Sequence, residues 1–211
     1  MKKILGLAIA AVLVMALVGF GTFSYFSDQE TSNANQITAG TLYLDINNGT
    51  TNYTILTGIT NQQPGNSGSS FAPLKNMGTL AGDFYIQTGA VTNTGAVLGS
   101  GKYADGVGQL GADSQIALWV DVNDNGVFDA GDLCLTSSGT VETYTAAGGV
   151  LPYDSWNNFA SKTWKPVIAS MAPNAIVNCY INYQIPTSVT NEIQGDSVQL
   201  SLTFCLNQVG Q

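Results

Sequence analysis

The part of the sequence best suited to chemistry is the acidic segment DVNDNGVFDAGD, residues 121–132. Oxygen-bearing side chains stand at nearly every second position, and a glycine stands at the sixth. Ca²⁺ prefers six to eight oxygen ligands, and a loop with this spacing wraps alternate side chains around the ion. The predicted ligands are the side chains of Asp121, Asn123, Asn125, Asp129 and Asp132 and the backbone carbonyl of Val127.

Three carboxylates at ligand positions repel one another unless a cation neutralises them, which favours the calcium interpretation. The segment follows an apolar strand-like run instead of a helix, and its last position is Asp132 where an EF-hand has Glu. A metal-free turn is the alternative, because Asn, Asp and Gly favour turns by themselves. We therefore expect a calcium loop placed between two strands, without the helices of an EF-hand.

The sequence gives little support for a catalytic site. The chain contains no histidine, which excludes a Ser-His-Asp triad, a Cys-His dyad and the HExxH zinc proteases. The remaining carboxylates are scattered, and no pair of them is marked for glycoside hydrolysis. The sequence predicts that the protein is not an enzyme.

The N-terminus predicts export. Two lysines precede an apolar run from Ile4 to Phe20, and small and then polar residues follow it without a basic stop-transfer cluster. We expect cleavage near Tyr25–Phe26, with a retained anchor helix as the alternative. Removal of residues 1–25 leaves four basic against 14 acidic residues, a net charge of −10. Such an acidic chain is a poor partner for nucleic acid or an anionic lipid surface, so we expect an extracellular or cell-surface protein with no stable membrane span after cleavage.

The elements that must position the acidic segment are short and alternating in polarity, which is typical of an all-β sandwich. In the clearest two, Val177, Cys179 and Ile181 share one face, as do Val198, Leu200, Leu202 and Phe204. A short helix is expected somewhere within residues 155–170. The predicted strands are 41–46, 52–59, 69–74, 82–88, 115–122, 133–136, 141–144, 176–185 and 197–207.

The three cysteines all fall in predicted strands. Alternation places Cys179 on the core face and Cys134 and Cys205 opposite the apolar sets of their strands, which favours a Cys134–Cys205 disulfide in an oxidising compartment. Three unpaired cysteines are the alternative. Asn48 and Asn52 begin two sequons in a polar turn, and such triplets also arise by chance in a chain rich in Asn and Thr.

Four stretches resemble the camelysin/TasA family, which includes secreted biofilm-matrix fibre proteins and archaeal bundling-pilus subunits. They are GTFSYFSDQETSNANQITAGTLYLDI at the signal exit, QQPGNSGSSFAPLKNMGTLAGDFYI with its P-G turn, SQIALWVDVNDNGVFDAGD, and NEIQGDSVQLSLTFCLNQ at the end. The resemblance implies a dedicated signal peptidase and a jelly-roll sandwich that polymerises head to tail by donor-strand exchange. Some bacterial relatives are called metalloproteases; without a histidine here, we do not expect that activity.

The expected organisation is a signal peptide (1–25), an extended donor segment (26–40) and a single jelly-roll domain (41–211). Phe26, Ala34 and Ile37 are the apolar residues of the donor segment that are expected to dock into the next copy. A disordered tail is the alternative for this segment. For the whole protein, the alternative to a filament subunit is a monomeric secreted Ca²⁺-dependent module that binds carbohydrate or a surface.

Overall fold

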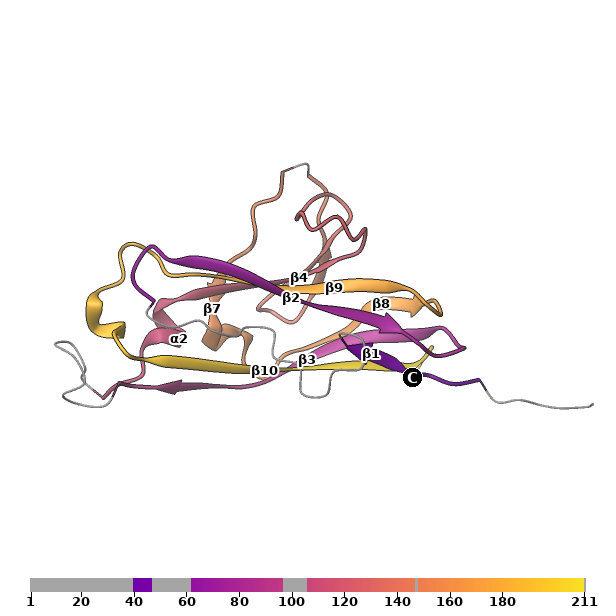
Figure 1. Ribbon diagram of the computed structural model, residues 1–211, viewed down its shortest axis with the longest axis horizontal. Helices are drawn as coiled ribbons and strands as arrows, with labels where there is room; N and C mark the ends of the chain where they lie inside the picture. The colour runs from indigo at the N-terminus through magenta and orange to yellow at the C-terminus, as the bar shows by residue number, and fades with distance from the viewer. Residues whose placement is uncertain (1–39, 47–61, 97–105, 147, 211) are drawn as a thin grey trace, which may run out of the picture. The chain divides into compact units, whose positions relative to one another are not determined.

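The computed structural model describes residues 40–46, 62–96, 106–146 and 148–210 (Figure 1). Residues Ala39–Gln211 form one compact unit. No helix among the described residues is long and apolar enough to cross a membrane. Several predictions lie outside these residues: the signal peptide, the donor residues Phe26, Ala34 and Ile37, the strand at 52–59, and the sequons at Asn48 and Asn52.

The described residues form two antiparallel sheets, which confirms the predicted all-β sandwich. The first sheet has the strand order β1-β2-β9-β4-β5-β6, with β7 beside β4, and the second has the order β10-β3-β8. Among these residues, helical structure is limited to α2 (Leu110–Asp113) and the 3-10 turns Trp156–Phe159 and Asn191–Ile193. The strands are β1 (Leu44–Ile46), β2 (Ser67–Asn76), β3 (Gly82–Thr94), β4 (Gln115–Asp121), β5 (Leu133–Leu135), β6 (Val141–Thr143), β7 (Asp154–Ser155), β8 (Thr163–Met171), β9 (Ile176–Gln184) and β10 (Ser197–Gln208).

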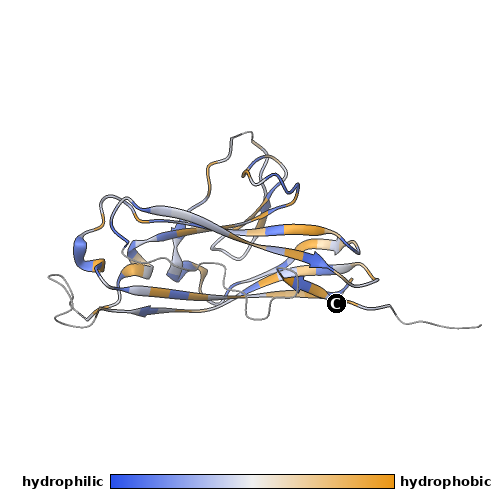
Figure 2. Cartoon of the chain, viewed as in Figure 1, coloured by the Kyte–Doolittle hydropathy of each residue, from blue (hydrophilic) through white to orange (hydrophobic). Residues whose placement is uncertain are grey.

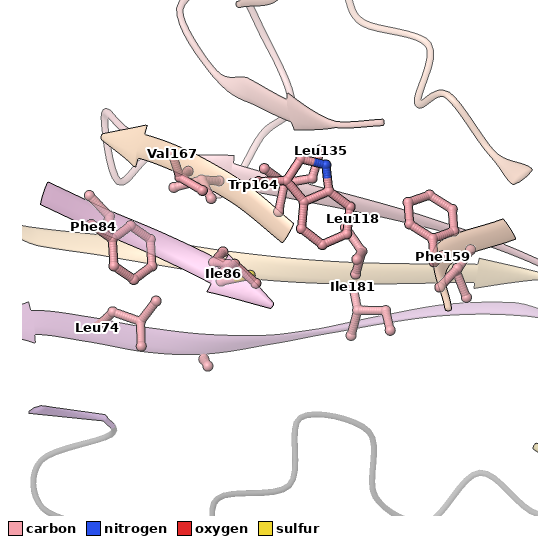
Figure 3. Packing of buried hydrophobic residues seen from close by; sticks show 14 of the residues in the cluster. Leu74, Phe84, Ile86, Leu118, Leu135, Phe159, Trp164, Val167 and Ile181 are labelled. Atoms are coloured by element: carbon pink, nitrogen blue, oxygen red, sulfur yellow. The ribbon is translucent and has the colours of Figure 1, made fainter. Parts of the chain in front are cut away.

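The main core lies between the two sheets because alternate residues of each strand point inward. Figure 3 shows Leu118 and Ile181 from the first sheet together with Phe84 and Trp164 from the second, and all four are fully or almost fully buried. The indole Nε1 of Trp164 donates a hydrogen bond of 3.0 Å to the carbonyl oxygen of Thr136, so its one polar atom is satisfied. The predicted core face of β9, with Val177, Cys179 and Ile181, is confirmed.

Residues 155–170, where a short helix is expected, contain a single 3-10 turn followed by strand β8. The turn is capped by Ser155, whose side chain accepts from the backbone N–H of Asn157. β8 is an edge strand of the second sheet and contains Pro166, which lacks a backbone donor and is therefore tolerated there. The register shifts between β3 and β8 explain why a simple period of two is not visible in the sequence.

Strand β10 has the longest free edge in the described sandwich. It pairs with β3 from Ser197 to Gln208 and has no partner on its other side among the described residues. Its inward-facing apolar residues pack against the main core but remain half-buried: Val198, Leu200, Leu202, Phe204 and Leu206.

The predicted Cys134–Cys205 disulfide is wrong, because all three cysteines are free. Cys134 packs with Trp119 on the outer face of the first sheet, whereas Cys205 alternates with core-facing residues of β10 and faces outward from the second sheet. Sheets stack about 10 Å apart, and a disulfide needs Cα atoms about 4.4–6.8 Å apart. Alternation correctly placed each cysteine on the side of its strand opposite the apolar residues. However, this side is the outer face of the first sheet for Cys134 and the outer face of the second sheet for Cys205, so the two thiols lie on opposite sides of the sandwich.

We expect alkylation to distinguish these thiols in the folded protein. Burial raises the pKa of Cys179 to about 12, and burial together with the nearby carboxylates of Glu142 and Asp132 raises that of Cys134 to about 11. Because the thiolate is the reactive form, iodoacetamide at pH 8 should label the half-buried Cys205 first. Mass spectrometry should count three labelled thiols after denaturation; a count of one would mean that a disulfide exists.

Candidate calcium-binding loop

The acidic segment forms the connection between β4 and β5, as the sequence predicted. β4 ends at Asp121 and β5 begins at Leu133, so residues 122–132 form a loop between two hydrogen-bonded strands. Gly126 has a φ of +74°, a backbone conformation that a side chain at this position would strain. The glycine at the sixth position of the segment therefore permits a sharp turn of the backbone.

Asp121 organises the first half of the loop from a fully buried position. Its Oδ1 accepts the backbone N–H of Asp124 at 2.7 Å, and its Oδ2 accepts that of Gly126 at 2.8 Å. These bonds stabilise the carboxylate and wind the backbone around it. Replacing Asp121 would remove the acceptor of the backbone N–H groups of Asp124 and Gly126, so the residue is structural whether or not an ion is bound.

Asp129 lies where the amide side chains of the loop converge. Its Oδ1 accepts from Nδ2 of Asn123 at 3.1 Å, and its Oδ2 accepts from Nδ2 of Asn125 at 2.8 Å. Rotation of both amides by half a turn exchanges their nitrogens and oxygens, and would present two amide oxygens next to the Asp129 carboxylate. The loop thus brings three predicted ligand residues together, and their side chains hydrogen-bond to one another.

Asp132 closes the loop from the far end and is also fully buried. Its two carboxylate oxygens accept the backbone N–H groups of Val122 at 3.2 Å and of Asp129 at 3.0 Å. Burial raises the pKa of Asp132 above its usual value, opposed by these two hydrogen bonds, and the charges of Asp121 and Asp129 add to the increase. A nearby cation would reverse this effect.

The raised pKa gives a pH prediction for the calcium-free protein. The contribution of Asp132 to stability is fully present below its unfolded-state pKa of about 3.9 and is lost as the pH rises through the higher folded-state pKa. Asp132→Asn should therefore flatten this part of the stability profile in chelator. Urea unfolding at a series of pH values measures it, with Glu142→Gln, an exposed carboxylate on β6, as the control. Identical profiles for wild type and Asp132→Asn would contradict the assignment.

A smaller hydrophobic cluster, separate from the main core and made mostly of aromatic residues, attaches the loop to the first sheet. Phe128 packs edge-on against Trp119 with ring centroids 5.3 Å apart, and against Tyr144 at 4.5 Å. Trp119 in turn stacks on Tyr180 of β9 at 4.3 Å. The cluster lies on the outer face of the first sheet, separate from the main core.

Two residues of β9 that sequence reasoning did not assign to the loop also contact it. Nδ2 of Asn178 donates to Oδ1 of Asp124, which is not among the predicted calcium ligands. Burial and the charges of Asp121, Asp124 and Asp132 raise the pKa of the Tyr180 hydroxyl. Alternation along β9 puts both residues on the outer face, but only the pairing of β9 with β4 places that face beside the loop.

The geometry provides oxygen ligands but not a cluster of charged metal ligands. Within residues 40–46, 62–96, 106–146 and 148–210, no three His, Cys, Asp or Glu side chains are grouped so that they could hold a metal ion. A cation at this loop would need amide and carbonyl oxygens among its ligands and a rearrangement of the Asn–Asp129 hydrogen bonds. Ca²⁺ accepts such mixed oxygen ligands in flexible geometry.

Comparison with known protein families gives one match. A family model described as camelysin metallo-endopeptidase matches residues 1–96. A search of curated proteins gave no match. The matched region ends two residues after strand β3, before β4 and the acidic loop.

The family description contradicts the prediction that the protein is not an enzyme, because it names a metal-dependent endopeptidase. The described residues nevertheless do not fit a peptidase metal centre. The sequence has no histidine, and the described residues contain no group of three charged or thiol ligands. Over residues 1–96 the chain is similar to the camelysin family, which confirms the resemblance predicted from the sequence.

Proposed function

We propose that the mature chain is a structural subunit of an extracellular filament, in which residues 26–40 of one copy add a strand to the sandwich of the next. The observation that carries this proposal is the free edge of β10. Its backbone donors and acceptors have no strand partner on that side among the described residues, and its inward-facing apolar row is only half-buried.

A long, free strand edge in a soluble protein is normally protected by charge, proline or a bulge that twists it away. The sequence of β10, SVQLSLTFCLNQ, contains neither a charged residue nor a proline. One register shift occurs near Leu200, and the strand otherwise pairs regularly with β3. These properties favour a strand that receives another strand.

The length of the proposed donor matches this edge. Residues 26–38 would span about 43 Å as a strand at about 3.3 Å per residue, comparable with the twelve residues of β10. Main-chain hydrogen bonds would supply affinity, and Phe26, Ala34 and Ile37 would cover the half-buried apolar row. Because donor and acceptor are different parts of the chain, the contact is head to tail and extends into a filament.

The camelysin similarity supports secretion, since that family is associated with the cell surface and extracellular space. In this proposal a signal peptidase removes residues 1–25 near Tyr25–Phe26. Ca²⁺ binds the loop through Asp121, Asn123, Asn125, Asp129, Asp132 and the carbonyl of Val127, and stabilises the subunit. The hydrogen-bonded convergence of Asn123 and Asn125 on Asp129 supports this part of the proposal.

Electron microscopy of the native secreted protein tests the proposal directly. Uniform thin fibres that contain only this chain are the expected result. Monomers at every concentration would overturn it and favour the alternative, a monomeric secreted calcium-dependent module that binds carbohydrate or a surface. A retained N-terminal Met1 by mass spectrometry would contradict the proposed cleavage.

A further inference from the structure

We infer that one end of the sandwich carries a docking surface for the copy that accepts the N-terminal segment. This surface, the end patch, consists of five exposed apolar side chains: Tyr43, Met77, Leu80, Ile176 and Val209. The inference rests on the proposed filament function, and adds to it a second contact that strand addition alone does not require.

Backbone contacts place the first three residues together. The N–H of Met77 donates to the carbonyl of Tyr43 at 2.7 Å, and the N–H of Leu80 donates to the carbonyl of Thr41 at 3.2 Å. The segment that enters β1 therefore lies directly against the turn between β2 and β3. A methyl group added at Gly40 would lie 2.3 Å from Cγ of Leu80, so a larger residue at this position would require the Leu80 side chain to move.

Strand register places the other two residues at the same end. Ile176 begins β9 and pairs with Lys75, two residues before Met77. Val209 follows Gln208, which pairs with Gly82, two residues after Leu80. Figure 1 shows β1 and the C-terminal end of β10 at this end of the sandwich, and Figure 2 shows apolar and polar residues alternating along the strands there.

The five side chains are between 43% and 55% exposed and carry no charge. Single exposed apolar residues are ordinary on a protein surface, whereas a group of them at one place marks a contact surface. The chain as a whole is strongly acidic. The five side chains themselves add no charge repulsion between two copies.

The path of the chain identifies the occupant as that second copy. The described part of the sandwich begins at Gly40, which lies close to the Leu80 side chain of the patch. If residues 26–38 pair along β10 of an acceptor, Gly40, which lies beside Leu80 of the patch, is only two positions beyond the last residue of the donor strand. Two residues span at most about 7 Å, so the acceptor must lie against this end and cover the patch.

The test compares variants of the mature chain, residues 26–211, that each add one negative charge. Met77→Glu and Ile176→Glu alter the patch, and Val150→Glu alters an equally apolar, 83% exposed residue between β6 and β7. Sedimentation velocity over a concentration series gives the critical concentration for polymerisation. Both patch variants should raise it about tenfold or more, because a buried charge without a partner opposes the contact, while Val150→Glu should match wild type.

Two further measurements separate the possible outcomes. Melting temperatures near that of wild type should show that the exposed substitutions leave the fold intact. A peptide of residues 26–38 should bind the patch variants as tightly as wild type, because the patch is not the strand acceptor. Patch variants that polymerise like Val150→Glu would overturn the inference and leave strand addition standing. A wild-type chain that stays monomeric would overturn both.

Discussion

Deleting residues 26–38 from the mature chain should abolish fibres and leave a folded, monomeric domain. The deletion removes the proposed donor strand but none of the described strands, so the two sheets and the main core remain. Without a donor, the edge of β10 would have no strand from a neighbouring copy to pair with. Electron microscopy and sedimentation velocity should show loss of polymer, and circular dichroism should retain the strand signal.

A variant of equal length provides the matched control. Replacing Phe26, Ala34 and Ile37 by serine keeps the backbone hydrogen bonds and removes the apolar side chains that would fill the acceptor. It should weaken polymerisation less than the deletion does. A peptide of residues 26–38 should cap growing ends and slow fibre growth. Fibres of the deletion variant with wild-type appearance and melting temperature would show that the N-terminal segment is not the donor.

Calcium should raise the melting temperature of the wild-type domain, and Asp121→Ala should abolish the increase. An ion that binds only the folded chain stabilises it by about 2.7 kcal/mol when its free concentration is 100 times its Kd. For a chain of this size, 1 kcal/mol corresponds to about 2–4 °C, so we expect an increase of about 5–10 °C. The measurement is the difference between melting in Ca²⁺ and in chelator.

The difference between the melting temperatures in Ca²⁺ and in chelator separates ion binding from the structural role of Asp121. Its carboxylate accepts backbone hydrogen bonds from the loop, so Asp121→Ala should also lower the melting temperature in chelator. Glu142→Gln removes a carboxylate outside the loop and should keep the full calcium response. If chelator leaves the melting temperature of the wild-type domain unchanged, the loop is a metal-free turn, and Asp121→Ala then lowers the melting temperature equally with and without Ca²⁺.

The sequence predicted the fold class and the faces of the most regular strands, because a period of two is a local property. This alternation predicted strand β9 and the buried position of Cys179 on it, and it predicted that the acidic loop lies between two strands. β8 did not, because Pro166 and the irregular pairing with β3 hide its alternation. The half-buried state of the β10 apolar row could not be predicted either, since it depends on what lies across the sandwich.

The site was predictable where its residues are consecutive and unpredictable where they come from different strands. Spacing alone identified the loop and its glycine turn. The contact of Asn178 with Asp124 requires knowing that β9 lies beside β4. The cysteine pair failed for the same reason, because alternation assigns a face within a strand and does not say to which sheet the strand belongs.

The pairing of β10 with β3 along its whole length determines how a fibre would respond to force. Tension applied along an added strand would load its hydrogen bonds with β10 in shear, so that many must break together. The same load would then enter the domain through the β10–β3 pairing, which runs from Ser197 to Gln208. A subunit built this way would transmit pulling force through its second sheet, while the acidic loop on the outer face of the first sheet would remain outside the path of the load.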